Sequence, residues 1–235
     1  MEAFAKSDRS RLEARWLGRV SYDRGLALQR DAAARAASGG DGSGSESLLL
    51  LEHDPVYTLG RNASRDDVLW TAERLEALAI ALRESDRGGK VTYHGPGQLV
   101  GYPIVRLEAG RRDVKRYVHD LEEVLIRTLA DFGIASTRSD RRERVTSVWV
   151  ANAKIAAIGI HVARWVTTHG FSLNVTDEPL AAFAGIVPCG ITDGGVTSIE
   201  RETGSAPSFG ALIRRLLPHF ASVFGRDVVL GAPEG

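Results

Sequence analysis

Cys189 is the only cysteine in this chain of 235 residues, and it lies in the segment Ile186-Val187-Pro188-Cys189-Gly190. Without a second cysteine the chain cannot form an internal disulfide, and a cysteine-rich metal site is excluded as well. Pro188 fixes one backbone dihedral, and Gly190 lets a ligand or another backbone segment approach closely. Two interpretations stay open: Cys189 is a small buried hydrophobic residue, or it is a nucleophilic thiol, which needs an electropositive and partly exposed setting.

A second residue that could take part in a reaction is Lys154, which begins the otherwise apolar run Lys154-Ile155-Ala156-Ala157-Ile158-Gly159-Ile160-His161. Burying an unpaired ammonium group is costly, so a lysine in such a run needs an explanation. Either the side chain extends from a sheet edge to water, or its charge is balanced by an anion such as a thiolate.

Two glycine-containing segments resemble neither ordinary strands nor ordinary turns. In Arg87–Gly97 (RGGKVTYHGPG) paired glycines precede a strand-like run, which weakens the strand but lets a ligand lie against the backbone. A plain glycine-rich turn is the alternative, and a phosphate-binding loop is excluded because no Gly-Lys-Ser/Thr leads into a helix. In His169–Val175 (HGFSLNV) small residues surround a strand start, and its His169 and Asn174 suit buried polar groups equally well.

Composition indicates a soluble globular protein, with 43% hydrophobic and 26% charged residues and a formal net charge of zero. Bulk attraction to nucleic acid or to an anionic membrane is therefore not expected. No apolar run approaches the ~20 residues that span a bilayer, and the charged segment 1–11 lacks the apolar core of a signal peptide. We expect a cytoplasmic protein, in which a free thiol stays reduced.

Positive charge is concentrated in two clusters, which suit either solvated faces or docking sites for an acidic protein partner. The clusters are Arg111, Arg112, Lys115 and Arg116, and Arg138, Arg141, Arg142 and Arg144.

Apolar periodicity predicts the elements that must position these residues. The first half of the chain predicts a helix over 21–37, a flexible Gly/Ser-rich loop over 38–45 and a buried strand at Leu48–Leu51. It then predicts a short strand at Val56–Leu59, a helix over 71–79 with Thr71 as its N-cap, and two strands within 90–105 joined by a turn at His94–Gly97.

In the second half Asp113 caps an amphipathic helix that ends at Gly133, and a last helix runs from about Ser208 to Phe224. Between them lie three β runs, at 145–150, 154–162 and 171–175. Because the strands outnumber the helices and often follow one another, we expect an α+β fold with a mixed, largely antiparallel sheet and packed helices. We expect residues 1–235 to form one domain.

Taken together, these segments resemble the octanoyltransferases of lipoate biosynthesis, the lipoyl(octanoyl) transferase family. The resemblance extends from about residue 16 to residue 224 and includes Gly60-Arg61-Asn62, Arg87–Gly101, Lys154–Gly159, His169–Val175 and Pro188-Cys189-Gly190. Segments 38–45 and 138–144 fit the family pattern more loosely, and Ser147 stands where the family has glycine. The resemblance implies the fold of the biotin and lipoate protein ligase catalytic domain.

The resemblance also implies an acyltransferase that moves an octanoyl group from acyl carrier protein to a lysine of lipoyl domains, the first step of endogenous lipoate synthesis and protein lipoylation. Cys189 would carry the octanoyl group as a thioester, and Lys154 would lower the pKa of the thiol and then act as acid and base. The acyl group arrives on the phosphopantetheine of acyl carrier protein, so neither a metal nor a cofactor is expected. The acceptors would be the lipoyl domains of 2-oxoacid dehydrogenase complexes and the H protein of glycine cleavage.

The same resemblance implies an acyl groove lined by small residues and closely approaching backbone, in which His94 and Tyr93 position groups near the thioester. The implied groove residues are Arg87, Gly88, Gly89, Lys90, Val91, Thr92, Tyr93, His94, Ala157, Ile158, Gly159, Gly170, Phe171 and Ser172. Two alternatives stay open. An ATP-dependent lipoate or biotin protein ligase would need no cysteine, and a non-catalytic module would only bind carrier proteins.

Overall fold

The computed structural model describes residues 10–38, 45–138, 146–187 and 195–231. Within these residues a nine-stranded main sheet has the strand order β12-β1-β2-β6-β10-β9-β8-β7, and β11 pairs with β9 outside this path. Its strands are β1 (Arg11–Val20), β2 (Glu46–His53), β6 (Gln98–Ile104), β7 (Thr137–Arg138), β8 (Ser147–Val150), β9 (Ala153–Ala163), β10 (Val166–Asn174), β11 (Gly195–Val196) and β12 (Asp227–Leu230).

The pairing in this sheet is mixed. Strands β12, β1 and β2 run parallel to one another, and β11 is parallel to β9. The strands from β2 through β6, β10, β9 and β8 to β7 pair antiparallel. The expected α+β fold with a largely antiparallel sheet is confirmed.

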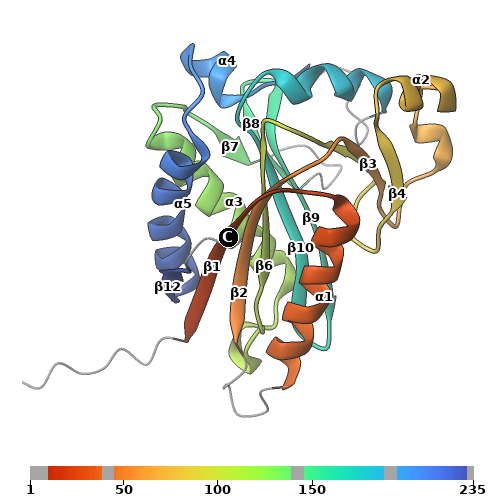
Figure 1. The fold of residues 1–235 in the computed structure, drawn as a ribbon. Coiled ribbons are helices and arrows are strands. Elements are labelled where there is room, and N and C mark those ends of the chain that lie inside the picture. The colour runs from red at the N-terminus through yellow and green to blue at the C-terminus, as the bar shows by residue number, and fades with distance from the viewer. Residues whose placement is uncertain (1–9, 39–44, 139–145, 188–194, 232–235) are drawn as a thin grey trace, which may run out of the picture.

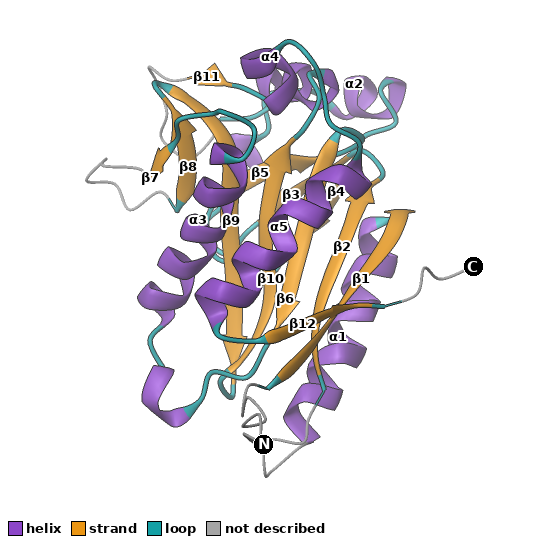
Figure 2. Ribbon diagram, turned by 90° about the vertical axis from the view of Figure 1, so that its left-hand side faces the viewer, coloured by secondary structure: helices purple, strands orange, loops and turns teal. Residues whose placement is uncertain are grey.

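Helices cover both faces of the main sheet (Figures 1 and 2). The long helices α3 (Val114–Ala130) and α5 (Phe209–Phe224) lie on one face, and α1 (Tyr22–Ser38) lies on the other. The shorter helices are α2 (Ala72–Ala77), α4 (Ile199–Thr203) and the 3-10 helices η1 (Arg65–Asp67), η2 (Ala109–Arg111) and η3 (Glu178–Gly185). None of the helices in the described part of the chain is long and apolar enough to cross a membrane.

The apolar run in β2 shows why a strand between two helical layers needs no polar face. Leu48 and Leu50 join the core beneath α3 and α5, whereas Leu49 and Leu51 join the core beneath α1. Since successive side chains of a strand point to opposite faces, a strand covered on both sides becomes a continuous hydrophobic run. The buried strand expected here is confirmed.

A second, three-stranded sheet packs on the α1 side of the main sheet and has the order β4-β3-β5 (Figure 1). It contains β3 (Val56–Leu59), β4 (Ala81–Glu84) and β5 (Val91–His94). The two strands expected within 90–105 are present, but they belong to different sheets. β5 pairs with β3, and β6 pairs with β2 and β10.

The chain crosses between the two sheets at the turn after His94. Gly97 has a φ of +84°, and its backbone oxygen accepts hydrogen bonds from the amides of Val175 and Thr176. A Cβ atom at this position would lie 2.0 Å from the Thr176 hydroxyl oxygen, so only glycine fits the turn. The turn therefore ties the end of β10 to the junction between the sheets.

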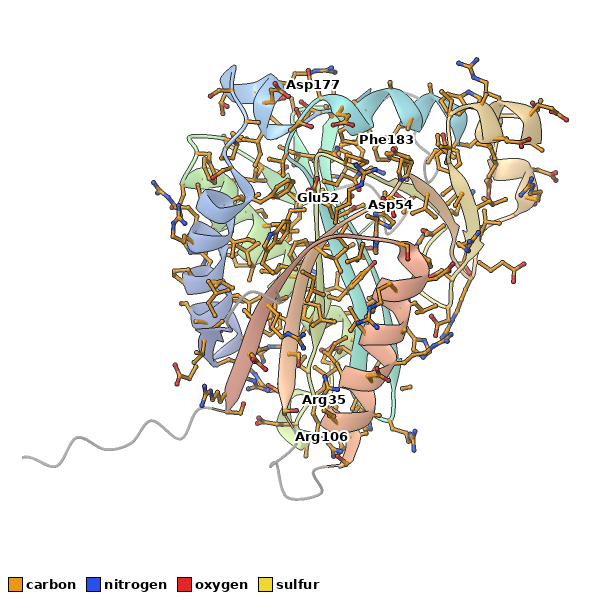
Figure 3. All side chains as sticks on the ribbon, viewed as in Figure 1. Arg35, Glu52, Asp54, Arg106, Asp177 and Phe183 are labelled. Atoms are coloured by element: carbon orange, nitrogen blue, oxygen red, sulfur yellow. The ribbon has the colours of Figure 1, made fainter. Side chains whose placement is uncertain are left out.

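The two ends of the main sheet are easy to follow in Figure 3. Asp177, shortly after β10, lies at the upper end, and Arg106 lies at the lower end. Arg106 forms a β-bridge with Val166, the first residue of β10, so the β9–β10 hairpin turn is at the lower end. Lys154, near the start of β9, belongs to the opposite end.

Candidate active site

One cavity between the main sheet and the β4-β3-β5 sheet brings together the segments that the sequence singled out. Its volume is about 290 Å³, at the lower limit of ordinary small-ligand pockets. The residues that line it are Tyr22, Asn62, Arg87, Gly88, Gly89, Lys90, Val91, Thr92, His94, Tyr102, Thr146, Ser147, Lys154, Ala157, Ile158, Gly159, His169, Gly170, Phe171 and Ser172.

Of the expected groove residues, all except Tyr93 line this cavity, together with Lys154. The Tyr93 ring instead makes edge-to-face contacts with Tyr57 and Phe183, at centroid distances of 5.6 and 6.1 Å. It thereby holds β5 against η3. Cys189 lies outside the described residues.

The floor of the cavity is a patch of small side chains on the paired strands β9 and β10. Ala157 lies opposite Ser172, and Gly159 lies opposite Gly170. Because alternate residues share a face, these four residues lie side by side on the α1 side of the sheet. The intervening residues Ile158 and Phe171 belong to the core on the α3 and α5 side.

A β-bulge puts Lys154 on the same face as this floor. Ala156 pairs with Val148 of β8, but the next pair is Lys154 with Trp149, so Ile155 is an extra residue in β9. Ile155 and Ala156 both join the core, whereas Lys154 lines the cavity and is only 5% exposed. Regular alternation would place Lys154 on the core face with Ala156, and the extra residue reverses this.

The roof of the cavity is the segment before β5, which is held down by Arg87. The Arg87 side chain is buried, and its Nη2 atom donates to the carbonyl oxygen and the hydroxyl of Thr58 at 2.6 and 2.8 Å. Its Nη1 atom donates to the carbonyl oxygen of Gly88 at 3.0 Å. Arg87 thus fixes the backbone of its own segment over the floor.

The Gly60-Arg61-Asn62 segment clamps the roof from the outside. The amides of Gly60, Arg61 and Asn62 donate to the carbonyl oxygens of Lys90, Arg87 and Gly89, respectively. A Cβ atom on Gly60 would lie 2.4 Å from the Gly89 oxygen, so the contact requires glycine. The Gly60-Arg61-Asn62 segment is therefore needed to hold the roof of the cavity in place, although it lies well before the roof segment in the sequence.

Six further residues line the cavity but were not among the expected groove residues. They are Tyr22, Asn62, Tyr102, Thr146, Ser147 and His169. Ser147, where the resemblance led us to expect glycine, is buried and accepts a hydrogen bond of 2.7 Å from the Trp149 indole. Asn62 and His169 lie in motifs quoted above, but Tyr22 and Tyr102 carry no local sequence signal, because only the tertiary packing brings them here.

Buried histidines and tyrosines surround the cavity on the α1 side. His53 Nδ1 lies 3.0 Å from the Val20 carbonyl oxygen, which can only accept, so Nδ1 carries the proton and Nε2 accepts from the Tyr102 hydroxyl at 2.7 Å. Burial lowers the pKa of His53 to about 4. His53 is therefore a neutral ring that supports Tyr102, which lines the cavity.

His169 connects the floor to α1 and to the roof. Its backbone amide donates to Gln29 Oε1 at 2.6 Å, and its Nε2 atom lies 2.7 Å from Asp86 Oδ1. Its φ of +57° turns the side chain out of the regular strand alternation. Burial lowers the pKa of His169, and the hydrogen bond with Asp86 opposes that shift.

Of the two arginine clusters, the structure places Arg112 far from Lys154, whereas Arg138 on β7 lies only two strands from the Lys154 segment. Arg112 stacks on the Trp165 ring at 5.2 Å, at the hairpin end of β9, some 30 Å along the strand from Lys154 by the ordinary rise per residue. Arg138 pairs with Glu122 and Glu123 on α3. Arg141, Arg142 and Arg144 lie outside the described residues.

With this geometry in view, comparison with known proteins defines the class. The lipoyl protein ligase A/B catalytic domain family matches residues 21–221. The fold is similar to that of lipoate-protein ligase A bound with ATP (TM-score 0.74, 16% identity, covering 93% of this chain and 88% of that one). It is also similar to that of biotin protein ligase from Aquifex aeolicus in complex with biotin and ATP (TM-score 0.55, 13% identity, 91% and 70%).

Closer relatives narrow the class. The chain is 46% identical over 218 residues to an octanoyltransferase of Caldicellulosiruptor bescii, covering 92% of this chain and 93% of the relative. It is 47% identical over 219 residues to an octanoyltransferase of Chloroflexus aurantiacus, covering 92% and 95%. The chain belongs to the octanoyltransferases within the lipoyl protein ligase A/B family, and it is an acyltransferase. The resemblance inferred from the motifs is confirmed.

Because His53 is neutral in the folded protein, we expect the folded state to lose stability as the pH falls. In the unfolded chain the ring takes up a proton near its ordinary pKa of 6.5, but in the folded protein it does so only near 4. Its contribution to stability is therefore complete above pH 6.5 and is lost as the pH falls toward 4, about 2 kcal/mol of it by pH 5. His53→Gln removes this titration while keeping an amide donor and acceptor.

The free energy of unfolding, measured by urea denaturation, should fall less between pH 7 and pH 5 in His53→Gln than in the unaltered protein, by about 2 kcal/mol. An identical fall in both proteins would show that His53 is not held neutral.

Proposed function

We propose that this acyltransferase moves an octanoyl group from acyl carrier protein to a lysine of lipoyl domains through a thioester on Cys189. The observation that carries the proposal is the cavity, in which the small-residue floor of β9 and β10 continues directly from Lys154. A straight alkyl chain needs such a narrow trough, and the reacting carbonyl needs a proton donor and acceptor at one end of it.

The acyl groove consists of the floor and the roof together. Ala157, Gly159, Gly170 and Ser172 leave the space that larger side chains would fill, and Gly88 and Gly89 bring the roof backbone close. Each methylene group that leaves water for an apolar site contributes about 0.8 kcal/mol, so burial of the alkyl chain contributes several kcal/mol to binding. No metal or cofactor has a part in this proposal, since the acyl group arrives already activated on phosphopantetheine.

In the first half of the reaction the Cys189 thiolate attacks the octanoyl thioester. The tetrahedral oxyanion collapses and expels the pantetheine sulfur, which takes a proton from the Lys154 ammonium. Backbone amides near Gly190 or in the roof segment are the proposed oxyanion donors. The products are an octanoyl thioester on Cys189, a free pantetheine thiol and a neutral Lys154.

In the second half the lysine amine of the lipoyl domain attacks the Cys189 thioester. The amine, whose ordinary pKa is about 10.4, first loses one proton to water, and neutral Lys154 accepts a second proton as the amine attacks. The Cys189 thiolate departs as the amide bond forms, which restores the starting ion pair. Lipoyl domains of 2-oxoacid dehydrogenase complexes and the glycine cleavage H protein are the proposed acceptors.

The described residue that precedes the Cys189 segment is anchored to η1, and the one that follows it is anchored beside Lys154. The Val187 amide donates to the Asp67 carbonyl oxygen, and Gly195 pairs with Ala153, the neighbour of Lys154. The chain connectivity is thus compatible with a thiol at the Lys154 end of the cavity.

The reaction can be followed by intact mass spectrometry with octanoyl-acyl carrier protein and no ATP. We expect a mass gain of one octanoyl group in the unaltered enzyme and none in Cys189→Ser. A reaction that requires ATP would instead indicate a ligase, and no adduct with or without ATP would leave only a binding module.

The same assay tests Lys154. Lys154→Ala should slow acylation by tens-fold at pH 6, where an ordinary thiol with a pKa near 8.5 is almost entirely protonated. At pH 9 the thiol ionises without help, so the loss should shrink to a few-fold. Equal slowing at both pH values would contradict a role for Lys154 in ionising the thiol.

Substitution of the floor residue Gly159 should change the preference of the enzyme for the length of the acyl chain. A Cβ atom there would lie 3.1 Å from both Arg87 Cδ and the Gly88 oxygen, so it narrows the trough and requires the roof to shift by only a few tenths of an ångström. Gly159→Ala should lower the ratio of kcat/KM for octanoyl over hexanoyl donors about tenfold, because about two methylene groups lose their place. Gly110→Ala, where a Cβ meets nothing within 4 Å, is the matched control and should keep the ratio. An unchanged ratio in Gly159→Ala would contradict the proposal that the distal part of the acyl chain lies on this part of the floor.

A further inference from the structure

Three buried side chains beside the cavity form a directed chain of hydrogen bonds that ends on His94. Asn174 Nδ2 donates to the Thr197 carbonyl oxygen at 2.8 Å, and Asn174 Oδ1 accepts from Gln98 Nε2 at 2.9 Å. Gln98 Oε1 lies 3.3 Å from His94 Nδ1. Asn174, Gln98 and His94 are all less than 10% exposed.

The direction of this chain determines which ring nitrogen carries the proton. A backbone carbonyl can only accept, so the Asn174 amide must present its NH₂ group to Thr197 and its oxygen to Gln98. Gln98 must then present its NH₂ group to Asn174 and its oxygen to His94. His94 Nδ1 is therefore the donor, and in the neutral ring Nε2 is an unprotonated acceptor.

The surroundings of His94 keep the ring neutral. His53 on β2 lies at a ring-centroid distance of 5.9 Å, and Arg87 in the roof and His169 on β10 also disfavour a second positive charge. Lys154 on β9 lines the same cavity. Burial and these neighbours hold the pKa of His94 well below its ordinary range.

Sheet register places this group at the Lys154 end of the cavity. Gln98 lies directly opposite Asn174, one residue beyond the Leu173–Ala156 pair in the direction of Lys154. The Thr197 residue that orients Asn174 also donates its amide to the Lys154 carbonyl oxygen at 3.0 Å. The hydrogen-bond chain is thus built onto the backbone of the Lys154 segment.

We propose that His94 Nε2 accepts a hydrogen bond from the attacking lysine amine in the second half of the reaction, with Gln98 and Asn174 as positioning residues. The inference rests on the proposed function. An amine that attacks a carbonyl carbon must aim its lone pair at that carbon, so its N–H bonds need acceptors elsewhere. Lys154 takes the proton that is transferred, and His94 fixes the orientation of the amine.

The two half-reactions separate this role from a structural one. With octanoyl-pantetheine as donor, acyl-enzyme formation in His94→Phe should slow at least tenfold less than the transfer step does, because His94 lines the cavity in both steps but accepts from the amine only in the second. With the preformed acyl-enzyme and Nα-acetyl-lysine amide as acceptor, transfer should slow on the order of 100-fold. In His94→Gln, whose amide oxygen can reach the place of Nε2, most of the transfer rate should return.

The hydrogen-bond chain has its own test in the unaltered protein, which does not depend on the folding of any variant. Nitrogen-15 NMR of the His94 ring should show a protonated Nδ1 and an unprotonated Nε2 at pH 7. Gln98→Glu cannot donate to Asn174 and favours the imidazolium form, so both nitrogens should be protonated at pH 7. Transfer should then be slow at pH 7 and recover at higher pH as the ring loses its proton.

Equal slowing of the two half-reactions in His94→Phe, or no slowing of transfer, would overturn the proposal. A proton on Nε2 in the unaltered protein would do the same. In each of these cases an octanoyl adduct on Cys189 would leave the proposed function standing, whereas the absence of any adduct would refute the proposed function itself.

Discussion

The structure of the site depends on the register between β9 and β10. Four small residues, Ala157, Gly159, Gly170 and Ser172, meet on one face only because Ala157 pairs with Ser172 and Gly159 with Gly170. A shift of one residue in either strand would turn Ile158 or Phe171 into the cavity and fill it. The bulge at Ile155 belongs to the same constraint, since it gives Lys154 the cavity face while Ile155 and Ala156 both pack in the core.

Hydrogen bonds also fix the positions of the charged and polar side chains around this trough. Arg87 directs its guanidinium group into hydrogen bonds with Thr58 and Gly88. His53 and His94 face the same region as neutral rings whose hydrogen bonds define their tautomers. A cavity with this wall offers oriented donors and acceptors and has Lys154 at the end of its floor, which suits proton transfer during acyl exchange.

Much of the fold could be predicted where one signal dominated. Helix α3 begins after Asp113, whose carboxylate accepts from the Lys115 and Arg116 amides, and Thr71 caps α2 as expected. Helix α5 begins at Phe209, one residue after its expected start, and Ser208 is its N-cap. Strand β1 was missed, although Leu12 and Ala14 are buried between exposed Arg11 and Glu13 and show a two-residue period. The two-residue period is short, because the register with β2 shifts between Trp16 and Arg19, and pairing with β2 and β12 makes the whole segment a strand.

The residues of the candidate site also include some that the sequence could predict and others that it could not. Glycines, Lys154 and His94 could be predicted because they stand in compact motifs of unusual composition. Tyr22, Tyr102 and the Asn174–Gln98 pair could not, since residues 76 positions apart meet only through the β6–β10 register. The bulge was equally hidden, because a run such as Lys154–Gly159 reads as regular alternation until its partner strand is known.

The most direct measurement is a crystal structure of the enzyme after reaction with an octanoyl donor. The account predicts an alkyl chain lying along Ala157, Gly159, Gly170 and Ser172, with its carbonyl carbon at the Lys154 end. A chain bound elsewhere, for example in the cavity that Leu26, Gln29 and Ala163 line between α1 and the β9–β10 hairpin, would contradict it.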